Sequence, residues 1–319
     1  NIDGRDIDFR VSVMPLMGHE KVVMRILDVS RGAPTLESLG FASDQYNIIK
    51  KTIERTSGLI LITGPTGSGK TTTLYSILNI LNQDNVNIAT LEDPVEYFLK
   101  GVNQSQVRPE VNFTFATGLR SLLRQDPDIM MVGEIRDNET AELAVHASLT
   151  GHLVLSTLHT NDAIGAIPRL IDMKVEPFLL TSSLVLVVAQ RLVRLSCTHC
   201  LVEEKISGDI SNYIQELLAK IPESVIKERL PNYNPQQMTF KKGTGCAYCD
   251  QTGYHSRTVL AEVLEINDEV RSMILQDESF NEDKVKATQP FITMEQDGMI
   301  KALQGLTTVE EVMRVIQSD

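Results

Sequence analysis

This sequence of 319 residues has no excess of basic residues, no long apolar run and only four cysteines. Its 42 Asp and Glu residues outnumber its 30 Lys and Arg residues, which gives a formal net charge of -12 and a pI near 5.0. Proteins that bind duplex nucleic acid usually present a basic face, so this balance argues against nucleic acid as the main partner. The 42% hydrophobic and 23% charged fractions are typical of a globular protein, and the length suits two or three domains.

The longest apolar run, FLLTSSLVLVVAQ, covers residues 178–190. Thr181, Ser182 and Ser183 interrupt it, and it is shorter than the ~20 apolar residues that cross a bilayer. We therefore predict a buried helix there rather than a membrane span. We expect no secretory signal, and because the first residue is Asn1 rather than Met we expect a fragment or a processed chain.

The four cysteines form two C-x-x-C pairs, CTHC at 197–200 and CAYC at 246–249. Two such pairs provide the four thiolates of a tetrahedral zinc site, in which each Zn–S bond measures about 2.3 Å. The 45 residues between the pairs exceed the roughly 15–20 of a compact zinc ribbon, so the insert must form a small unit of its own. We predict that Zn²⁺ is bound by Cys197, Cys200, Cys246 and Cys249. Free thiols and a disulfide are the alternatives, and His199 is expected to be a bystander.

Short apolar runs alternate with helix-like segments through residues 41–196. The runs that resemble strands are residues 58–62, 86–91, 128–132 and 152–158. This alternation predicts an α/β fold with a mostly parallel sheet covered by helices.

The flanking segments differ from this core. Residues 1–30 alternate apolar and polar positions and predict a two-stranded hairpin, which we assign to the C-terminal part of an α+β domain because two strands alone are marginally stable. Residues 31–40 contain Gly, Pro and Ser and predict a linker. Residues 197–255 hold the cysteines around a polar, helix-like insert, and residues 256–319 are predicted to form a helical subdomain.

The stretch GPTGSGKT fits the phosphate-binding pattern GxxxxGK[ST] at every fixed position. In this pattern glycines let backbone N–H groups turn toward phosphate oxygens, Lys70 reaches the β- and γ-phosphates of ATP, and the Thr71 hydroxyl ligates Mg²⁺. An apolar run precedes it and a helical pattern follows from Thr72 to Leu81, which is the context that such a loop requires. We predict that the nucleotide contacts Gly64, Pro65, Thr66, Gly67, Ser68, Gly69, Lys70, Thr71 and Thr72.

Two acidic sites follow strand-like runs and are candidates for the partner acids of this loop. Glu134 comes at the end of DIMMVGE, where most P-loop proteins carry an Asp that binds Mg²⁺ indirectly. Glu92, Asp93 and Glu96 follow the run at 86–91. Two carboxylate sites beside one P-loop suit a division between metal binding and water activation. Solvated acids in turns are the alternative.

Two histidines, His152 and His159, flank the run at 152–158. A lone histidine is more often a structural hydrogen-bonding group than a catalytic one. His159, with Thr157 and Asn161, is nevertheless placed where a γ-phosphate sensor belongs, and we predict a functional role for it. The role of His152 stays open.

Four blocks in this order resemble the secretion ATPases of type II secretion and type IV pilus systems. GPTGSGKTTTLY resembles their Walker A, LEDPVEY their Asp box, LRQDPDIMMVGEIRD their Walker B and GHLVLSTLHTND their His box. The match continues through AQRLVRLSC and GLTTVEEVMRV and covers nearly all of the sequence. The paired C-x-x-C segments resemble the assembly branch, the GspE/PilB group, because retraction motors of the PilT type lack them.

The resemblance implies a hexameric, RecA-like ATPase that lies on the cytoplasmic face of the bacterial inner membrane. It would act on a platform protein of the GspF/PilC type and add pilin or pseudopilin subunits to a fibre. The preceding hairpin would be the end of a PAS-like domain. Family members also carry an upstream region that docks to a membrane-anchored protein, and that region is absent here.

The resemblance also implies roles for single residues. Glu92 would activate water, Glu134 would be the Walker B acid, and His152 and His159 would belong to the His box. The family's arginines map onto Arg10 and Arg25 in the hairpin and Arg120 and Arg124 in the core. From their spacing alone, the last two share one helical face, and an exposed, solvated pair is the alternative.

Two other functions stay open at the level of sequence. A RecA-like nucleic-acid translocase shares the core and the ring, although the acidic balance and the lack of aromatic and basic clusters oppose it. A catalytically weak scaffold is opposed by the intact Lys70, Glu92 and Glu134. The choice between pilus and secretion use is open.

Overall fold

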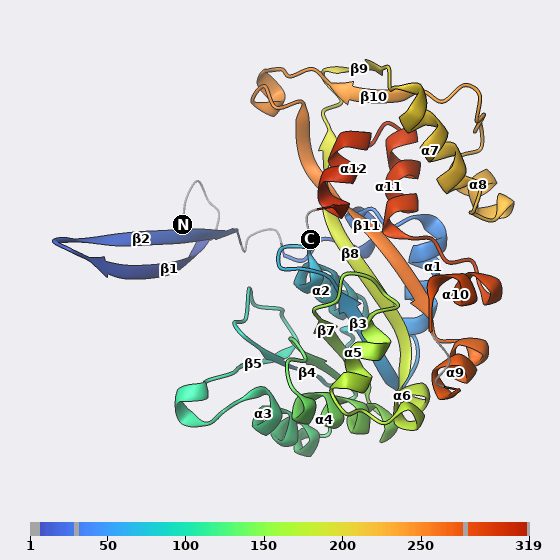
Figure 1. The fold of residues 1–319 in the computed structure, drawn as a ribbon. Coiled ribbons are helices and arrows are strands. Elements are labelled where there is room, and N and C mark those ends of the chain that lie inside the picture. The colour runs from blue at the N-terminus through green and yellow to red at the C-terminus, as the bar shows by residue number, and fades with distance from the viewer. Residues whose placement is uncertain (1–6, 29–31, 277–279, 318–319) are drawn as a thin grey trace.

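A seven-stranded sheet forms the centre of the computed structural model, which describes residues 7–28, 32–276 and 280–317 (Figure 1). The strand order is β11-β8-β3-β7-β6-β4-β5. The strands are β3 (Gly58–Thr63), β4 (Ile88–Glu92), β5 (Asn103–Gln106), β6 (Ile129–Val132), β7 (Leu153–Leu158), β8 (Leu184–Ser196) and β11 (Tyr254–Glu265). Every pairing in this sheet is parallel except that of β11 with β8. This confirms the predicted α/β class, and the four predicted strands are present as β3, β4, β6 and β7.

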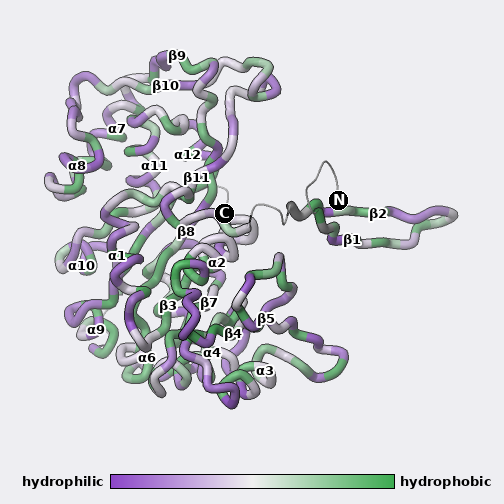
Figure 2. Tube along the Cα trace, turned by 180° about the vertical axis from the view of Figure 1, so that it is seen from behind, coloured by the Kyte–Doolittle hydropathy of each residue, from purple (hydrophilic) through white to green (hydrophobic). Residues whose placement is uncertain are grey.

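Side chains of β3 contribute to two apolar layers, one on each face of the sheet. Leu59 and Leu61 belong to one layer, and Ile60 and Ile62 belong to the other. Because a parallel sheet is covered on both faces, its inner strands are apolar throughout. Figure 2 shows the hydrophobic residues concentrated along these inner strands.

Helices cover both layers. The layer with Ile60 is completed by α1 (Ser43–Ile53) and α2 (Lys70–Leu81). The layer with Leu59 is covered by α3 (Phe115–Leu122), α4 (Asn138–Leu149), α5 (Ala166–Asp172), α6 (Pro177–Ser183), α9 (Asp268–Leu275), α10 (Glu282–Thr288), α11 (Met294–Leu303) and α12 (Val309–Ile316). Short 3-10 turns are η2 (Leu36–Leu39), η3 (Pro109–Val111), η4 (Leu123–Gln125) and η5 (Ala247–Cys249). Within the described residues, no helix has both the length and the apolar character that crossing a bilayer requires.

Two predictions for the C-terminal half are wrong. Residues 178–190 were expected to be one buried helix, but α6 ends at Ser183 and the chain then enters β8. An apolar run of this length does not by itself separate a buried helix from a buried strand, and the β-branched residues of LVLVV favour the strand. Residues 254–265 form β11, which extends the central sheet. The sequence had divided these residues between the cysteine segment and a helical subdomain.

The N-terminal hairpin is confirmed over the described residues. β1 (Ile7–Leu16) pairs antiparallel with β2 (His19–Asp28), and Figure 1 shows the pair projecting away from the sheet. The parts of the predicted hairpin domain and linker that fall on residues 1–6 and 29–31 lie outside the described residues. The described part of the linker packs on the core, since Leu36 is fully buried and the Ser76 hydroxyl of α2 donates to the Pro34 carbonyl at 2.6 Å.

The segment between the cysteine pairs contains two strands and two helices, and its buried residues Ile214, Leu218 and Phe240 belong to the same apolar layer as Leu59. It therefore packs on the core, whereas the sequence predicted a small unit of its own. β9 (Leu201–Glu204) pairs antiparallel with β10 (Phe240–Gly243), and α7 (Gly208–Leu218) and α8 (Glu223–Arg229) lie between them in sequence. These elements lie side by side at one end of the molecule in Figure 1.

Candidate functional site

A cavity of about 610 Å³ lies at the carboxyl ends of the parallel strands β3, β4, β6 and β7. Its lining includes Thr66 to Thr72 of the P-loop, together with Glu92, Glu134, His159 and, from the hairpin, Arg25. Ligands of open α/β sheets bind at this edge, because all parallel strands end there. One cleft thus contains residues from all four sequence blocks and from the hairpin. We call it the nucleotide cleft.

The P-loop has the geometry of a phosphate cradle. Gly64 has a φ of 141°, and a Cβ there would lie 2.4 Å from the Gln190 carbonyl oxygen, so only glycine fits. Lys70 begins α2, and its ammonium donates to the carbonyls of Gly64 and Pro65 at 2.7 and 3.0 Å. The buried hydroxyl of Ser68 has no hydrogen-bond partner in the described structure. These polar groups suit a phosphate, whose oxygens accept hydrogen bonds from hydroxyl and ammonium groups.

Burial lowers the pKa of Lys70, while the nearby Glu134 carboxylate opposes this effect. A cation that is partly desolvated in this way interacts more strongly with an anionic ligand than a solvated lysine would. The residues present therefore fit both a nucleotide phosphate and its Mg²⁺, for which the Thr71 hydroxyl is the direct ligand in the P-loop pattern.

Glu92, the last residue of β4, is 2% exposed and accepts three side-chain hydrogen bonds. The Tyr75 hydroxyl donates to its Oε2. Its Oε1 accepts from the Thr90 hydroxyl at 2.5 Å and from the Gln104 amide at 3.1 Å. Burial raises the pKa of Glu92, and these three donors lower it in part. A buried carboxylate with a raised pKa is a stronger base than a solvated one, which suits proton abstraction from water.

Glu134 lies just past the end of β6 and connects two other blocks. Its Oε1 pairs with the guanidinium of Arg136, and its Oε2 lies 3.4 Å from Nε2 of His159. Arg136 also approaches Asp93 of the Asp box, with 3.8 Å between Nη1 and Oδ2. The Glu134 hydrogen bond raises the pKa of Arg136. Glu134 and His159 are therefore neighbours in the nucleotide cleft.

The structure does not bring every candidate into this cleft. His152 precedes β7, whereas His159 follows this six-residue strand, which spans about 20 Å. Nδ1 of His152 lies 2.9 Å from the Ala147 carbonyl oxygen. This is the structural hydrogen bond that was the alternative to a catalytic role. Arg10 lies directly opposite Arg25 in the hairpin register.

Arg120 and Arg124 also lie outside the lining of the nucleotide cleft. Arg120 pairs with Glu139 at 2.5 Å, and both side chains are about half exposed at 50% and 54%. Arg124 donates to the Arg120 carbonyl at 2.9 Å. The expectation that both share one face of a single helix is wrong in detail, because α3 ends at Leu122 and Arg124 lies in the 3-10 turn that follows.

The four predicted zinc ligands form one cluster. Their sulfur atoms all lie within 4.8 Å of one another, with Sγ–Sγ distances of 3.8 Å for Cys197–Cys246, 3.9 Å for Cys200–Cys249 and 3.7 Å for Cys246–Cys249. A tetrahedron with Zn–S bonds of about 2.3 Å has edges of roughly 3.8 Å, so the donor set fits Zn²⁺.

The backbone favours the thiolate form of Cys249, whereas burial raises the pKa of the Cys197 thiol to about 11. The N–H groups of Cys246 and Gly253 donate to Sγ of Cys249 at 3.2 and 3.3 Å. Burial alone would raise the pKa of the Cys249 thiol, but these donors outweigh it and lower the pKa to about 6. Thiolates are the form that binds metal, and four of them leave no position for a substrate. The cluster therefore suits a structural ion.

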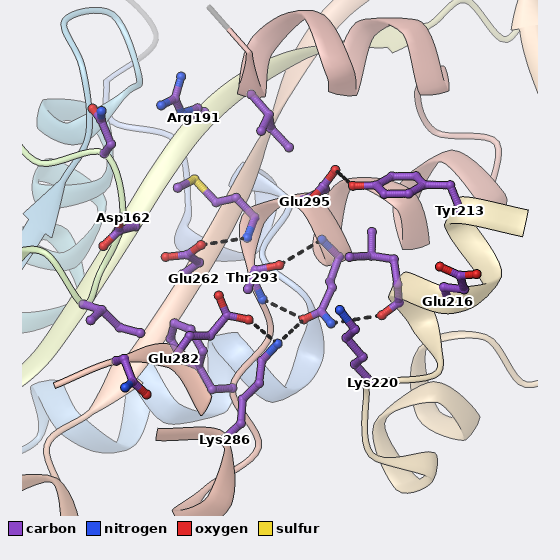
Figure 3. Close-up of a pocket in the computed structure, with 18 of the residues that line it drawn as sticks. Asp162, Arg191, Tyr213, Glu216, Lys220, Glu262, Glu282, Lys286, Thr293 and Glu295 are labelled. Carbon is purple, nitrogen blue, oxygen red and sulfur yellow. Dashed lines mark hydrogen bonds and ion pairs between the residues drawn. The ribbon is translucent and has the colours of Figure 1, made fainter. Parts of the chain in front are cut away.

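A second cavity, of about 760 Å³, lies between the loop after His159 and the C-terminal helices (Figure 3). Glu262 of β11, 6% exposed, accepts from the backbone N–H groups of Ala163 and Met294 at 2.9 and 3.0 Å. It thereby joins that loop to the start of α11. Among the described residues, the lining of this second cavity contains no part of the P-loop. We therefore assign the nucleotide to the smaller nucleotide cleft.

Comparison with known proteins agrees with this site. The family model described as "Type II/IV secretion system protein" matches residues 1–314. The chain belongs to this family. The Type II secretion system protein E of Pseudomonas aeruginosa is 47% identical over 318 residues, which cover 100% of this chain and 60% of that protein. The Type IV pilus assembly ATPase PilB of Thermus thermophilus is 46% identical over 309 residues, 97% of this chain and 33% of that protein. The resemblance found in the four blocks is thus confirmed, and the chain spans 60% or less of these two family members.

Two solved structures share the fold. A crystal structure of the pilus retraction motor PilT with bound ADP aligns with a TM-score of 0.69 at 29% identity, covering 99% of this chain and 77% of that chain. The Legionella pneumophila ATPase DotB aligns with a TM-score of 0.65 at 23% identity and covers 96% of this chain and 72% of its own.

Sequence reasoning missed four residues around the nucleotide cleft, namely Tyr75, Gln104, Arg136 and Gln190. The spacing of GEIRD was a usable signal for Arg136, because the arginine follows the Walker B acid by two positions. The other three interact through the tertiary fold, and no local pattern marks them.

Proposed function

We propose that this chain binds and hydrolyses ATP as the motor part of a type II secretion or type IV pilus assembly system. The observation that carries this proposal is the convergence of Lys70, Glu92, Glu134 and His159 on the nucleotide cleft. ATP hydrolysis uses a cation at the phosphates, a base for water, an acidic residue near Mg²⁺ and a contact to the γ-phosphate, and we assign these roles to the four side chains in that order. The relatives named above are secretion and pilus proteins, which gives the nucleic-acid alternative no support.

Each side chain has one task in the proposed reaction. Lys70 and the loop N–H groups hold the phosphates. The Thr71 hydroxyl and Glu134 would hold Mg²⁺, which would neutralise phosphate charge. Glu92 takes a proton from the attacking water, and His159 contacts the γ-phosphate from its position beside Glu134. The cysteine cluster binds Zn²⁺ and has no part in the chemistry.

We further propose that six copies form a ring and that arginines complete the charge around the γ-phosphate. Arg25 lines the nucleotide cleft, and its direct neighbour in the register is Arg10. Like charges at opposite positions of a strand pair repel, so an anion bound between Arg10 and Arg25 would reduce this repulsion. Arg120 of α3 and Arg124 of the following turn η4 are both exposed, so a neighbouring subunit could reach them.

The remaining proposals follow from the family. The ring would lie on the cytoplasmic face of the inner membrane, drive a platform protein of the GspF/PilC type and dock to a membrane-anchored protein through an upstream region. We propose no role for nucleic acid, in line with the net charge of -12. DNA or RNA added to the enzyme should not stimulate phosphate release.

A titration tests the motor proposal. Phosphate release per subunit is measured against protein concentration while light scattering follows the oligomeric state. Specific activity should rise as hexamers form, and Arg25→Ala should remove most of the rise. Lys21→Ala is the matched control, since Lys21 is a cation on the same strand and face that does not line the cleft. Specific activity that stays flat from monomer to hexamer would contradict the ring proposal.

A further inference from the structure

A hydrogen bond connects the Glu92 carboxylate to the helix that carries the P-loop lysine. Tyr75 lies on α2, five residues after Lys70, which is about one and a half helical turns. Its hydroxyl donates to Oε2 of Glu92. Tyr75 is fully buried, so this contact is shielded from solvent. The phosphate-binding end of α2 and the carboxylate at the end of β4 are therefore joined by one rigid element and one hydrogen bond.

The direction of this hydrogen bond follows from the other neighbours of the Tyr75 hydroxyl. The oxygen lies 3.3 Å from the backbone nitrogen of Glu96 and 3.4 Å from Nε2 of Gln104. Both groups can only donate, so the single hydroxyl proton is directed to Glu92. A donor aimed at a carboxylate favours its ionised form. Tyr75 thus holds Glu92 both in place and in the protonation state of a base.

We propose that Tyr75 is the positioning residue for the general base, fixing Glu92 at a set distance from the phosphates held by Lys70. The inference rests on the proposed function, because it requires that Glu92 accept a proton from water. In that step the water oxygen bonds to the γ-phosphorus, the bond to the bridging oxygen breaks, ADP leaves with its electron pair, and the water proton moves to Glu92. A displacement of about 1 Å in such a group costs about 10²-fold in rate.

Other groups around Glu92 set its proton affinity. Burial is the largest effect and raises the pKa of Glu92, and the negative charge of Glu96 adds to this rise. Hydrogen bonds from Thr90, Tyr75 and Gln104 lower the pKa. Removal of the Tyr75 donor should therefore raise the pKa of Glu92 further.

Charged side chains from other elements also face the space next to Glu92. Lys70 of α2, Glu134 and Arg136 after β6, and Arg25 of the hairpin line the same cleft. The Tyr97 ring packs edge-on against the Tyr75 ring, with 4.6 Å between ring centroids. These groups are unchanged by a substitution at position 75, so a shift in the pH profile of such a variant reports on the Tyr75 hydrogen bond.

Tyr75→Phe removes one oxygen and keeps the ring. Single-turnover phosphate release, with the protein in saturating excess over Mg-ATP, is measured from pH 5 to pH 9, which isolates chemistry from product release. Steady-state rates at varied ATP concentration give KM. The wild-type rate falls at low pH as Glu92 gains a proton. In Tyr75→Phe this acidic limb should move upward by about half a pH unit or more, since the variant lacks a donor to the carboxylate. The plateau rate should fall about tenfold with little change in KM, because positioning is lost while binding is kept.

Tyr97→Phe is the matched control. It removes the hydroxyl of a neighbouring, partly buried tyrosine, and this hydroxyl has no hydrogen-bond partner in the described structure. The acidic limb should therefore stay at its wild-type pH. Thr90→Val removes the hydroxyl donor to the other carboxylate oxygen and should also move the limb upward. Thermal unfolding shows whether Tyr75→Phe folds. If it does not, Thr90→Val tests whether loss of a hydroxyl donor raises the pKa of Glu92.

The outcomes separate the two proposals. A wild-type chain that releases no phosphate from ATP overturns the proposed function itself. An active wild type whose acidic limb coincides with that of a folded Tyr75→Phe variant overturns the role of Tyr75 alone. Equal shifts in Tyr75→Phe and Tyr97→Phe would also overturn it, because the effect would then arise from general disturbance of the site.

Discussion

The side-chain amide of Gln190 lies beneath the P-loop, where its Nε2 donates a 2.8 Å hydrogen bond to the Ser68 carbonyl. Its Oε1 accepts from the Thr73 hydroxyl of α2 at 2.9 Å, and the side chain is fully buried. One residue of β8 therefore connects the loop to the helix that follows it. The P-loop conformation depends on a strand that lies more than a hundred residues away in sequence.

Gln190→Leu should weaken nucleotide binding about tenfold. The substitution keeps the approximate size of the side chain but leaves the Ser68 carbonyl and the Thr73 hydroxyl without partners, which costs about 1–3 kcal/mol. Equilibrium titration with a fluorescent ADP analogue measures the effect. Gln190→Glu is the comparison: it keeps an acceptor for Thr73, but it places an acceptor against the Ser68 carbonyl and a carboxylate in a fully buried position, so it should weaken binding at least as much. Wild-type affinity in Gln190→Leu would contradict this role.

A buried charge network connects α8 to α1 and α11 of the core. Arg229, with a side chain 2% exposed, donates to both carboxylate oxygens of Asp44 on α1 and to Asp297 on α11. Arg229→Ala leaves Asp44 without its cation and removes one of the two cations of Asp297, which still pairs with Lys301 at 2.7 Å. The substitution should lower the free energy of unfolding by about 3 kcal/mol. Denaturant titration followed by circular dichroism measures the loss.

The matched control for this network is Lys227→Ala on the same helix. Lys227 pairs with Glu223, and the two side chains are 72% and 80% exposed. An exposed pair of this kind contributes at most about 1 kcal/mol. Equal losses in the two variants would mean that the Arg229 network does not hold α8 in place.

Purified protein should contain one zinc ion per chain. Elemental analysis measures the content, and Cys200→Ser should reduce it because one of four thiolates is lost. His199→Ala is the control and should keep the metal, since the His199 ring stacks on Tyr248 with 4.0 Å between centroids. Because ligand binding adds to folding free energy, a chelator should increase hydrogen exchange first in residues 197–255. Freshly purified protein that contains no zinc would contradict the assignment. Hydrogen exchange in residues 197–255 that a chelator leaves unchanged would also contradict it.

The stability of the chain should depend on pH through Glu262. Burial raises the pKa of Glu262 to about 7, although the backbone N–H groups of Ala163 and Met294 lower it in part. An unfolded Glu titrates near pH 4.3, so the folded state binds the proton more tightly. The stabilisation is complete below about pH 4.3 and is lost as the pH rises to about 7, by at most on the order of 3 kcal/mol.

Comparison with Glu262→Gln isolates this effect from other titrating groups. The difference in unfolding free energy between wild type and variant is measured by denaturant titration at several pH values. The wild type should lose stability relative to the variant between pH 4.5 and pH 7. A difference that is independent of pH would show that Glu262 stays ionised in the folded chain.

The reach of sequence reasoning differs between residue types in this fold. Lys70 and Glu134 line one cleft because parallel strands end at one edge of a sheet, so motifs that follow strands meet there. Tyr75 and Gln190 were not found, since their partners Glu92 and Ser68 are reached only through the tertiary fold. β5 was missed because NQSQ has no apolar residue and is held by its edge pairing with β4.

The most direct test of ATP hydrolysis at this cleft is a single phosphate-release assay on wild type, Lys70→Ala and Glu92→Gln, with nucleotide binding measured in parallel. Wild type should release phosphate only with Mg²⁺. Lys70→Ala should fall by at least ~10²-fold, because its charge offsets that of the transferring phosphoryl group. Glu92→Gln should bind ATP with near wild-type affinity and release phosphate slowly, because the amide cannot take the proton of the attacking water. Lys70→Ala activity above about a tenth of the wild-type rate would exclude the P-loop from the reaction, and a normal rate in Glu92→Gln would exclude Glu92 as the base.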